Sequence, residues 1–357
     1  MKVLIAAGGT GGHIYPGIAV AKEILRQDET NEVLFVGTAK GLETRIVPEN
    51  GFQLSLIHSA GLKNVGLVAK IKSLGMLPQS FLEARKIMRQ FRPHVVVGAG
   101  GYVSGPVLLM AAIMGLPTIV MDSNALPGFT NRRLAKFIDK AALTFEEAMP
   151  YFGKKGVVTG NPVRPEFFEI KPHEPGEKIE LLIFGGSQGA RAINEAVIAA
   201  LPLMGEMKNR LSITHQTGET MFDEVRAAYD AMEWEADIRP YITNMAESFD
   251  KADLVMSRAG ATTCAELVAA GKASILIPLP TAADDHQRKN AEALVTAGAA
   301  SMLLQGDLSG ESVARELETA IDQPTRIVAM SASAKKLGRP DAAEAVYHLI
   351  DELRRTA

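Results

Sequence analysis

Cysteine is almost absent from this sequence. The 357 residues include one, Cys264, and a single cysteine excludes an intramolecular disulfide and most zinc sites. The sequence also lacks an apolar run long enough to span a bilayer. Its opening, MKVLIAAGG, is typical of an apolar strand that runs into a glycine turn, not of a signal peptide. We therefore expect a folded protein of the cytoplasm in which Cys264 is a small buried side chain.

The charge of the chain is unevenly distributed, although its net value is only −3. Residues 1–160 hold 18 Lys and Arg against 11 Asp and Glu, whereas residues 161–357 hold 20 against 30. A hydrophobic fraction of 47% and the length of the chain allow two domains, each with its own core. The amino-terminal half is therefore the part that we expect to meet an anionic surface.

Glycine-rich loops follow predicted strands at residues 8–13, 98–106 and 185–190, and each loop leads into a helix. Glycine permits close backbone approach and a helix N-terminus attracts negative charge, so such loops are typical phosphate-binding sites. The first is not the dinucleotide fingerprint, because its spacing is G-G-x-G-G-H and no acid ends the next strand. His13 stands at the mouth of a helix predicted from about residue 15. The helix dipole there favours a neutral imidazole that can accept a proton, and a loop histidine bonded to a carbonyl is the alternative.

The stretch 253–290 is predicted to contain two buried strands, 254–257 and 274–279, and two helices, 262–270 and one that begins near 284. Loops at the carboxyl ends of parallel strands form the ligand-binding edge of an open α/β sheet. Here they carry Glu266, His286, Gln287 and Asn290, which suit a hydroxyl-rich nucleoside or sugar. Thr263-x-x-Glu266 and Asp284-x-x-Gln287 also have the spacing of capping boxes, so both pairs have a purely structural interpretation.

Two prolines at residues 162–165 and an acidic segment after them mark a domain boundary. We expect α/β domains with doubly wound parallel sheets at 1–161 and 165–340, and a helix over 341–357 that packs back on the first domain. Residues 63–92 are basic and apolar, and Gly75 and Pro78 are predicted to break them into two helices. This segment suits an anionic membrane interface, and an ordinary surface helix pair is the alternative.

The motifs GGTGGH, GGYVSGP and GGSQGA, with GNPVR between the domains and R-x-G-A-T-T-C-A-E near the end, resemble the MurG family of bacterial cell-wall N-acetylglucosaminyltransferases. Members transfer GlcNAc from UDP-GlcNAc to lipid I, undecaprenyl-diphospho-MurNAc-pentapeptide, and so make lipid II for peptidoglycan synthesis. The resemblance covers almost the whole chain. It implies a peripheral protein on the cytoplasmic face of the inner membrane, with the GT-B architecture: two Rossmann-like domains facing a cleft, the donor in the second.

The resemblance places the UDP-GlcNAc contacts at Thr10, Gly11, Gly12, Asn124, Arg164, Ser187, Ile242, Ala261, Thr262, Thr263, Cys264, Ala265, Glu266 and Gln287. Because Glu266 and Gln287 are among them, their functional interpretation is favoured over the capping one. The sequence departs from the family at residues 121–124, which read M-D-S-N where H-E-Q-N is frequent. It departs again at Ala259, where serine is frequent, and at His286, where glutamine is frequent.

The expected reaction is a single displacement with inversion at the anomeric carbon. His13, or Asp122 as the alternative, deprotonates the C4 hydroxyl of MurNAc, while glycine-loop N–H groups, Ser187 and Arg164 stabilise the departing UDP. No D-x-D motif stands at a suitable strand end, so we expect neither a metal nor another cofactor.

The expected partners are UDP-GlcNAc, lipid I and an anionic membrane, with other cell-wall proteins as further candidates and no nucleic acid. A glycosyltransferase with another lipid acceptor, a UDP-GlcNAc 2-epimerase and a non-enzymatic binding protein are the alternative functions.

Overall fold

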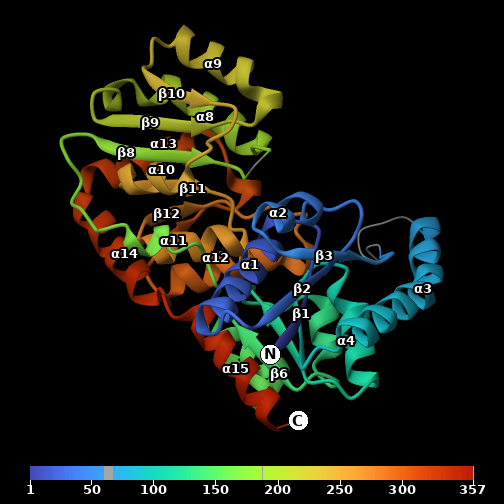
Figure 1. Cartoon of the computed structure of the whole chain (residues 1–357). Helices are drawn as coiled ribbons and strands as arrows, with labels where there is room; N and C mark the ends of the chain where they lie inside the picture. Colours follow the sequence, from blue (N-terminus) through green and yellow to red (C-terminus); the bar gives the residue numbers. More distant parts are fainter. Residues whose placement is uncertain (60–66, 187, 357) are drawn as a thin grey trace. The chain divides into compact units, whose positions relative to one another are not determined.

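The computed structural model describes residues 1–59, 67–186 and 188–356, and it divides the chain into two compact units. The first unit comprises Met1–Arg164 and Arg339–Ala357, and the second comprises Pro165–Gly338 (Figure 1). Residues 162–164 therefore belong to the first unit rather than to a linker beyond it. The chain starts in the first unit, passes through the whole of the second and returns.

The first unit is built on a seven-stranded parallel sheet in the order β3-β2-β1-β4-β5-β6-β7. Its strands are β1 (Lys2–Ala7), β2 (Glu32–Gly37), β3 (Gln53–Leu56), β4 (Val95–Gly100), β5 (Thr118–Asp122), β6 (Lys140–Leu143) and β7 (Gly156–Val158). Because the strand order reverses beside β1, helices cover both faces of the sheet. This is the doubly wound sheet predicted from the sequence.

Alternation along β1 shows how the two faces are filled. Val3, Ile5 and Ala7 pack in one core cluster with α1 (Gly11–Gln27), α2 (Glu43–Glu49) and α15 (Ala342–Thr356). Leu4 and Ala6 point the other way, into a cluster with α3 (Leu67–Phe91), α4 (Ser104–Ile113) and α5 (Phe129–Leu134). A strand buried on both faces needs apolar side chains at every position, which explains the continuous hydrophobic run at residues 3–7.

Two helices of the first unit differ from the prediction. α1 begins at Gly11, not near residue 15, so His13 lies inside its first turn. α3 is one continuous helix with Pro78 inside it, so the predicted break at Gly75 and Pro78 is wrong. Ala84 and Met88 of α3 are buried against α4, and this packing stabilises the helix past its proline. Short helices complete the unit: α6 (Met149–Phe152), η1 (Glu146–Ala148) and η2 (Gly153–Lys155).

The second unit is built on a six-stranded parallel sheet in the order β10-β9-β8-β11-β12-β13. Its strands are β8 (Ile179–Phe184), β9 (Leu211–Gln216), β10 (Ala236–Arg239), β11 (Leu254–Ser257), β12 (Ala273–Leu276) and β13 (Ala300–Met302). Its helices are α7 (Glu166–Glu169), α8 (Arg191–Ala200), α9 (Phe222–Ala231), α10 (Met245–Lys251), α11 (Ala261–Ala270), α12 (His286–Thr296), α13 (Gly310–Asp322) and α14 (Pro324–Leu337), with η3 (Leu201–Met207), η4 (Glu219–Met221), η5 (Ala283–Asp285) and η6 (Gln305–Asp307). The sheet again reverses its order, beside β8.

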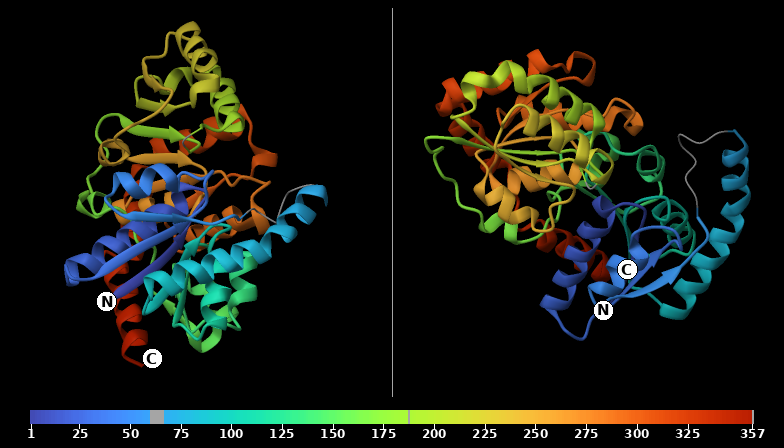
Figure 2. Two further views of the ribbon diagram at one scale, coloured as in Figure 1. Left: turned by 45° about the vertical axis from the view of Figure 1, so that its right-hand side comes forward. Right: turned by 90° about the horizontal axis from the view of Figure 1, so that it is seen from above.

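α15 packs on α1 within the first unit, and the views in Figures 1 and 2 show the red C-terminal helix beside it. Val346, Leu349 and Ile350 contribute to the same core cluster as the buried face of α1. Of the helices that the structure describes, none combines the length and the apolar character needed to cross a membrane.

Candidate active site

The first two glycine loops of the first unit interlock at the carboxyl ends of β1 and β4. Gly101 adopts a φ of +79°, and a Cβ there would overlap the carbonyl of Gly8. Gly100 has a φ of +124°, and a Cβ there would overlap the imidazole of His13. The buried Ser104 hydroxyl accepts the Gly100 N–H at 3.0 Å and donates to the Ala6 carbonyl at 2.9 Å. The second loop therefore fixes the place of the His13 ring.

Glu43 supports the first glycine loop through a hydrogen bond to its backbone. The sequence analysis did not identify this residue. Its side chain has no exposed surface, and it accepts hydrogen bonds from two neighbouring segments. Oε2 accepts the Gly9 N–H at 2.9 Å, and Oε1 accepts the N–H and the hydroxyl of Thr38, both at 2.8 Å. A Cβ on Gly8 or Gly41 would overlap this carboxylate, so glycines make the space that it occupies.

Asp122 is 4% exposed and holds the loop that follows β5. Oδ1 accepts the Asn124 N–H at 3.0 Å, while Oδ2 accepts the Gly128 N–H at 3.0 Å and Nδ2 of Asn131 at 2.8 Å. Burial raises the pKa of this carboxyl above its usual value, and the hydrogen bonds from Asn131, Asn124 and Gly128 oppose the rise. The geometry is that of a loop support whose oxygens already have donors.

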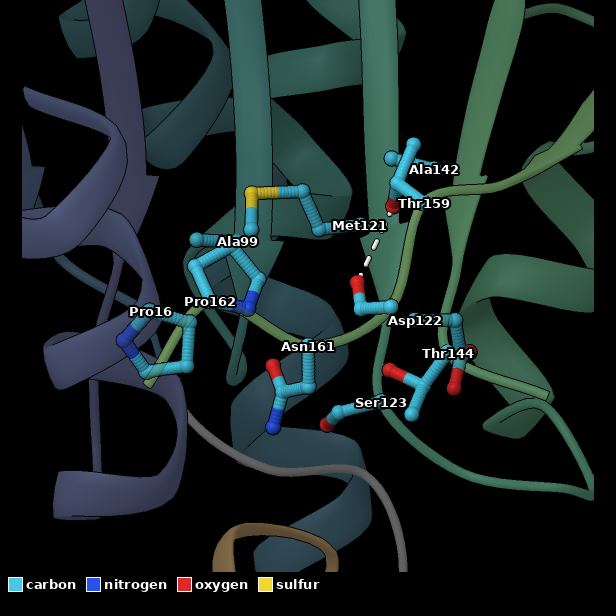
Figure 3. Close-up of a pocket in the computed structure, with 11 residues that line it drawn as sticks. Pro16, Ala99, Met121, Asp122, Ser123, Ala142, Thr144, Thr159, Asn161 and Pro162 are labelled. Atoms are coloured by element: carbon cyan, nitrogen blue, oxygen red, sulfur yellow. Dashed lines mark hydrogen bonds between the residues drawn. The ribbon is translucent and has the colours of Figure 1, made fainter. Parts of the chain in front are cut away.

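Figure 3 shows a small hollow beside Asp122, at the carboxyl ends of β4 to β7. The amide of Asn161 lies close to Ser123 in this view, and its Nδ2 is buried without a hydrogen-bond partner. The hollow is lined by Pro16, Ala99, Met121, Asp122, Ser123, Ala142, Thr144, Thr159, Gly160, Asn161 and Pro162. Polar atoms from three strands and the Asn161 segment thus meet at the same edge as the glycine loops.

The remaining predicted residues of the first unit lie at this edge or in the segment that leaves it. Thr10 is the exposed N-cap of α1, with a backbone carbonyl that accepts the His13 N–H, and Gly11 and Gly12 form the first turn. Asn124 is half-buried in the loop held by Asp122. Arg164, also half-buried, is the last residue before the second unit.

In the second unit, the third glycine loop and the loop after β10 lie on either side of Gln216. Nε2 of Gln216 donates to the carbonyl of Gly186, and Oε1 accepts the N–H of Ile242, both at 2.8 Å. The Ile242 N–H is therefore engaged by Gln216 and is not available to a ligand. A ligand that contacts the backbone of Ile242 would meet its carbonyl. Ser187 lies outside the described residues.

The first turn of α11 places several candidates together. Its N-cap is Gly260, so Thr263 is the third helical residue and Glu266 the sixth, and the capping-box interpretation of this pair is wrong. The N–H groups of Ala261, Thr262 and Thr263 precede the helical hydrogen bonds, which begin with Cys264 donating to Gly260. The Thr262 hydroxyl is buried without a partner. This turn thus presents backbone donors and a hydroxyl.

Six residues of α11, 261–266, are predicted to contact the ligand, and the side chains of two of them are buried in the protein. Cys264 is 1% exposed, and burial raises the pKa of its thiol to about 12. Ala265 is likewise buried, while Glu266 is half-buried. Cys264 is thus a protonated core residue, as its isolation in the sequence suggested.

Gln287 supports the loop after β12 rather than capping α12. Its Oε1 accepts the Leu279 N–H at 3.0 Å, and the N-cap of α12 is Asp285, which makes no side-chain cap. Arg258, the residue after β11, supports the same loop, because it donates to the carbonyls of Ile277 at 3.1 Å and Pro278 at 3.3 Å. The ends of β11 and β12 are thus tied together by these hydrogen bonds.

Two further observations bear on the expected cofactors and the membrane. Within the described ranges, no group of three or more His, Cys, Asp or Glu side chains is placed to hold a metal ion. Residues 63–66 of the basic apolar segment lie outside those ranges. In the described part of the segment, Leu82 is 66% exposed beside the exposed Arg85, Lys86 and Arg89.

The fold and the three glycine loops define a class of protein. The N-terminal domain of glycosyltransferase family 28 matches residues 3–143, and the C-terminal domain of that family matches residues 180–346. The matches contain the three glycine loops and, to within one residue, every strand of the two sheets except β7. The chain is a family 28 glycosyltransferase with the GT-B fold.

Within that class, the chain belongs to the MurG family, the UDP-N-acetylglucosamine–N-acetylmuramyl-(pentapeptide) pyrophosphoryl-undecaprenol N-acetylglucosamine transferases. The member from Geobacter sulfurreducens is 46% identical over 359 residues, which cover 99% of this chain and 98% of the relative. The crystal structure of MurG from Acinetobacter baumannii is 30% identical, has a TM-score of 0.82 and covers 98% of this chain and 99% of its own. The family resemblance drawn from the motifs is confirmed.

A UDP-GlcNAc 2-epimerase from Neisseria meningitidis, solved with UDP-GlcNAc bound, has a TM-score of 0.71 at 14% identity, over 99% of this chain and 100% of its own. At that identity the likeness concerns the fold alone.

Proposed function

We propose that this protein transfers GlcNAc from UDP-GlcNAc to the C4 hydroxyl of MurNAc in lipid I, with inversion at the anomeric carbon, and so makes lipid II. The observation that carries the proposal is 46% identity over nearly the full chain to a protein named for this transfer. The three glycine loops and the polar first turn of α11 supply the hydrogen-bonding groups that binding of a diphosphate, a ribose and a sugar requires.

UDP binds in the second unit. The third glycine loop, with Ser187, takes the diphosphate together with Arg164. The Ile242 carbonyl accepts a hydrogen bond from the base, and Glu266 accepts those of the ribose hydroxyls. The N–H groups at the start of α11 and the Gln287 amide nitrogen complete this set, while Cys264 and Ala265 contribute through the backbone only. Thr10, Gly11, Gly12 and Asn124 of the first unit contact the donor sugar.

His13 is the general base. Its place in the first turn of α1 favours the neutral imidazole, and the Gly100 contact holds the ring in one position. Asp122 is better suited to positioning, because its two oxygens accept three hydrogen bonds from the loop it supports. The base takes the proton of the attacking C4 hydroxyl as the bond to UDP breaks, and backbone N–H groups stabilise the charge that develops on the diphosphate.

The protein associates peripherally with the cytoplasmic face of the bacterial inner membrane through the basic apolar segment 63–92. Leu82 supplies exposed apolar surface, and Arg85, Lys86 and Arg89 supply positive charge around it. Ala84 and Met88 on the opposite side of α3 are buried in the first unit. An amphipathic helix of this kind is suited to an anionic interface.

The deciding experiment incubates the protein with UDP-GlcNAc and a soluble lipid I analogue in EDTA, and measures the disaccharide product and free UDP. Equal amounts of both products support the proposal. A second incubation without the acceptor tests the epimerase alternative, because isomerised sugar would appear there. A third replaces lipid I with diacylglycerol, and product there in place of disaccharide would contradict the proposed acceptor. Binding of UDP-GlcNAc without turnover in any of them would leave only a binding protein.

A further inference from the structure

Gln216 is a buried polar residue that none of the proposed contacts with the substrate uses. It is 1% exposed and ends β9, the strand between β8 and β10. In the sheet register it lies opposite Phe184 on one side and Arg239 on the other. The third glycine loop leaves the sheet just after Phe184, and the loop that contains Ile242 leaves it just after Arg239. Gln216 is therefore placed between the two loops assigned to opposite ends of UDP.

Both ends of the Gln216 amide are used. The Gly186 carbonyl accepts from Nε2 and the Ile242 N–H donates to Oε1, each at 2.8 Å. Burying an amide is costly unless its donor and acceptor are paired, and here each partner is backbone of a different loop. Gly186 has a φ of +93°, a conformation that glycine reaches without the steric cost of a Cβ, so the Gln216 hydrogen bond selects one of several peptide orientations open to it.

The segment after Gln216 adds to the connection. The N–H groups of Thr217 and Gly218 donate to the carbonyls of Arg239 at 3.0 Å and Pro240 at 3.1 Å. On the other side, a Cβ on Gly189 would overlap the Thr217 carbonyl. The two loops are thus in contact with one short segment, and Gln216 is the side chain that hydrogen-bonds to both.

We propose that Gln216 is a positioning residue that couples the diphosphate and base ends of the UDP site, so that binding at one end orders the other. This inference rests on the proposed function, since it takes UDP as the ligand. Gln216 sets the direction of the Gly186 peptide and leaves the Ile242 carbonyl as the group that meets the base. It acts through these two residues without touching the nucleotide.

The test measures the affinities of uridine, UMP and UDP by calorimetry for the wild type and for Gln216→Met, which keeps the length of the side chain and removes both hydrogen bonds. Two ordinary hydrogen bonds correspond to a loss of about ten- to a hundredfold in UDP affinity. We also expect the gain in affinity from uridine to UDP to be smaller in the variant, because the diphosphate loop is no longer coupled to the base.

His215→Leu is the matched control. His215 precedes Gln216 on the same strand and is fully buried, but it points to the opposite face, where it contacts Asn194 and Tyr229 at 3.2 and 3.3 Å. Burial lowers the pKa of His215 to about 3, so the variant removes no charge. Fluorescence of Trp234, the only tryptophan of the chain and 5% exposed in this unit, measures stability for both variants. A Gln216→Met protein whose uridine-to-UDP gain equals that of His215→Leu at similar stability would overturn the inference.

Gln216→Glu is a second variant that tests the same geometry by pH. Its carboxylate still accepts from Ile242 but repels the Gly186 carbonyl, whereas the protonated acid can donate to that carbonyl. The ratio of variant to wild-type UDP affinity should therefore rise as the pH falls through the titration of the carboxyl. A ratio independent of pH would count against the proposal. Failure of the wild type to bind UDP would instead refute the proposed function itself.

Discussion

Glu43→Gln should destabilise the first unit although it alters a side chain by one atom. The carboxylate accepts three hydrogen bonds through two oxygens, from Gly9 at one and from Thr38 at the other. An amide has one oxygen, so in either orientation its NH₂ group faces the backbone N–H of Gly9 or that of Thr38. A hydrogen bond to a charged group typically contributes roughly 1.5–3 kcal/mol. We expect the free energy of unfolding to fall by about that amount.

The assay separates the unfolding of the two units by means of the single tryptophan. Trp234 is the only one and lies in the second unit, so its fluorescence in urea reports that unit, while far-UV circular dichroism reports both. The Glu43→Gln transition should move to lower urea by circular dichroism and stay in place by fluorescence. Turnover should also fall, because Glu43 then no longer holds Gly9 and Thr38 together, and Gly9 belongs to the loop before His13.

Glu49→Gln on the same helix is the control. Its partner Arg45 is 3.8 Å away and both side chains are more than half exposed, so we expect a change within about 0.5 kcal/mol. A Glu43→Gln protein as stable and as active as Glu49→Gln would refute the role given to this carboxylate.

Three further variants test the site and the membrane surface. His13→Ala should lower turnover by roughly 10²–10⁴ while UDP affinity stays near the wild-type value, and near-normal turnover would exclude His13 as the base. Glu266→Ala should weaken UDP about ten- to a hundredfold in calorimetry, with 2′-deoxy-UDP affected less and the melting temperature little changed; an equal loss for both ligands would argue against the ribose contact. Reversing the charges of Arg85, Lys86 and Arg89 should release the protein from anionic vesicles, since each basic residue near such a surface contributes about 1 kcal/mol, while transfer to a soluble acceptor continues. Undiminished sedimentation with vesicles would place the attachment elsewhere.

The architecture was predictable because its signals are local. A short unbroken apolar run such as residues 95–97, followed by glycines, indicates a strand buried on both faces, and its repetition with helices predicts parallel sheets. The strand 254–257 and the helix that follows were placed to within one residue for the same reason. Helix α3 was misjudged, because packing on α4 outweighs the local preference of Pro78 to end a helix.

The supports of the site were not predictable, because their partners are distant in sequence. Glu43 is 34 residues from Gly9, and Gln216 is 30 from Gly186 and 26 from Ile242. A buried Glu or Gln has no sequence pattern of its own, and only the order of strands brings it beside the loop it supports. Thr263 and Glu266 show the converse, since their spacing fitted a capping box while the helix began at a different residue.

The return of the chain to the first unit affects the order in which the two units can complete their folding during synthesis. α15 supplies Val346, Leu349 and Ile350 to a core whose other members come mainly from the first 142 residues. During synthesis those residues emerge well before α15, and the complete second unit, Pro165–Gly338, is translated in between. A domain normally folds as it leaves the ribosome, amino-terminal first. Here the second unit can finish folding while α1 still exposes the apolar face that α15 will cover, so the half that is translated first is the last to be completed.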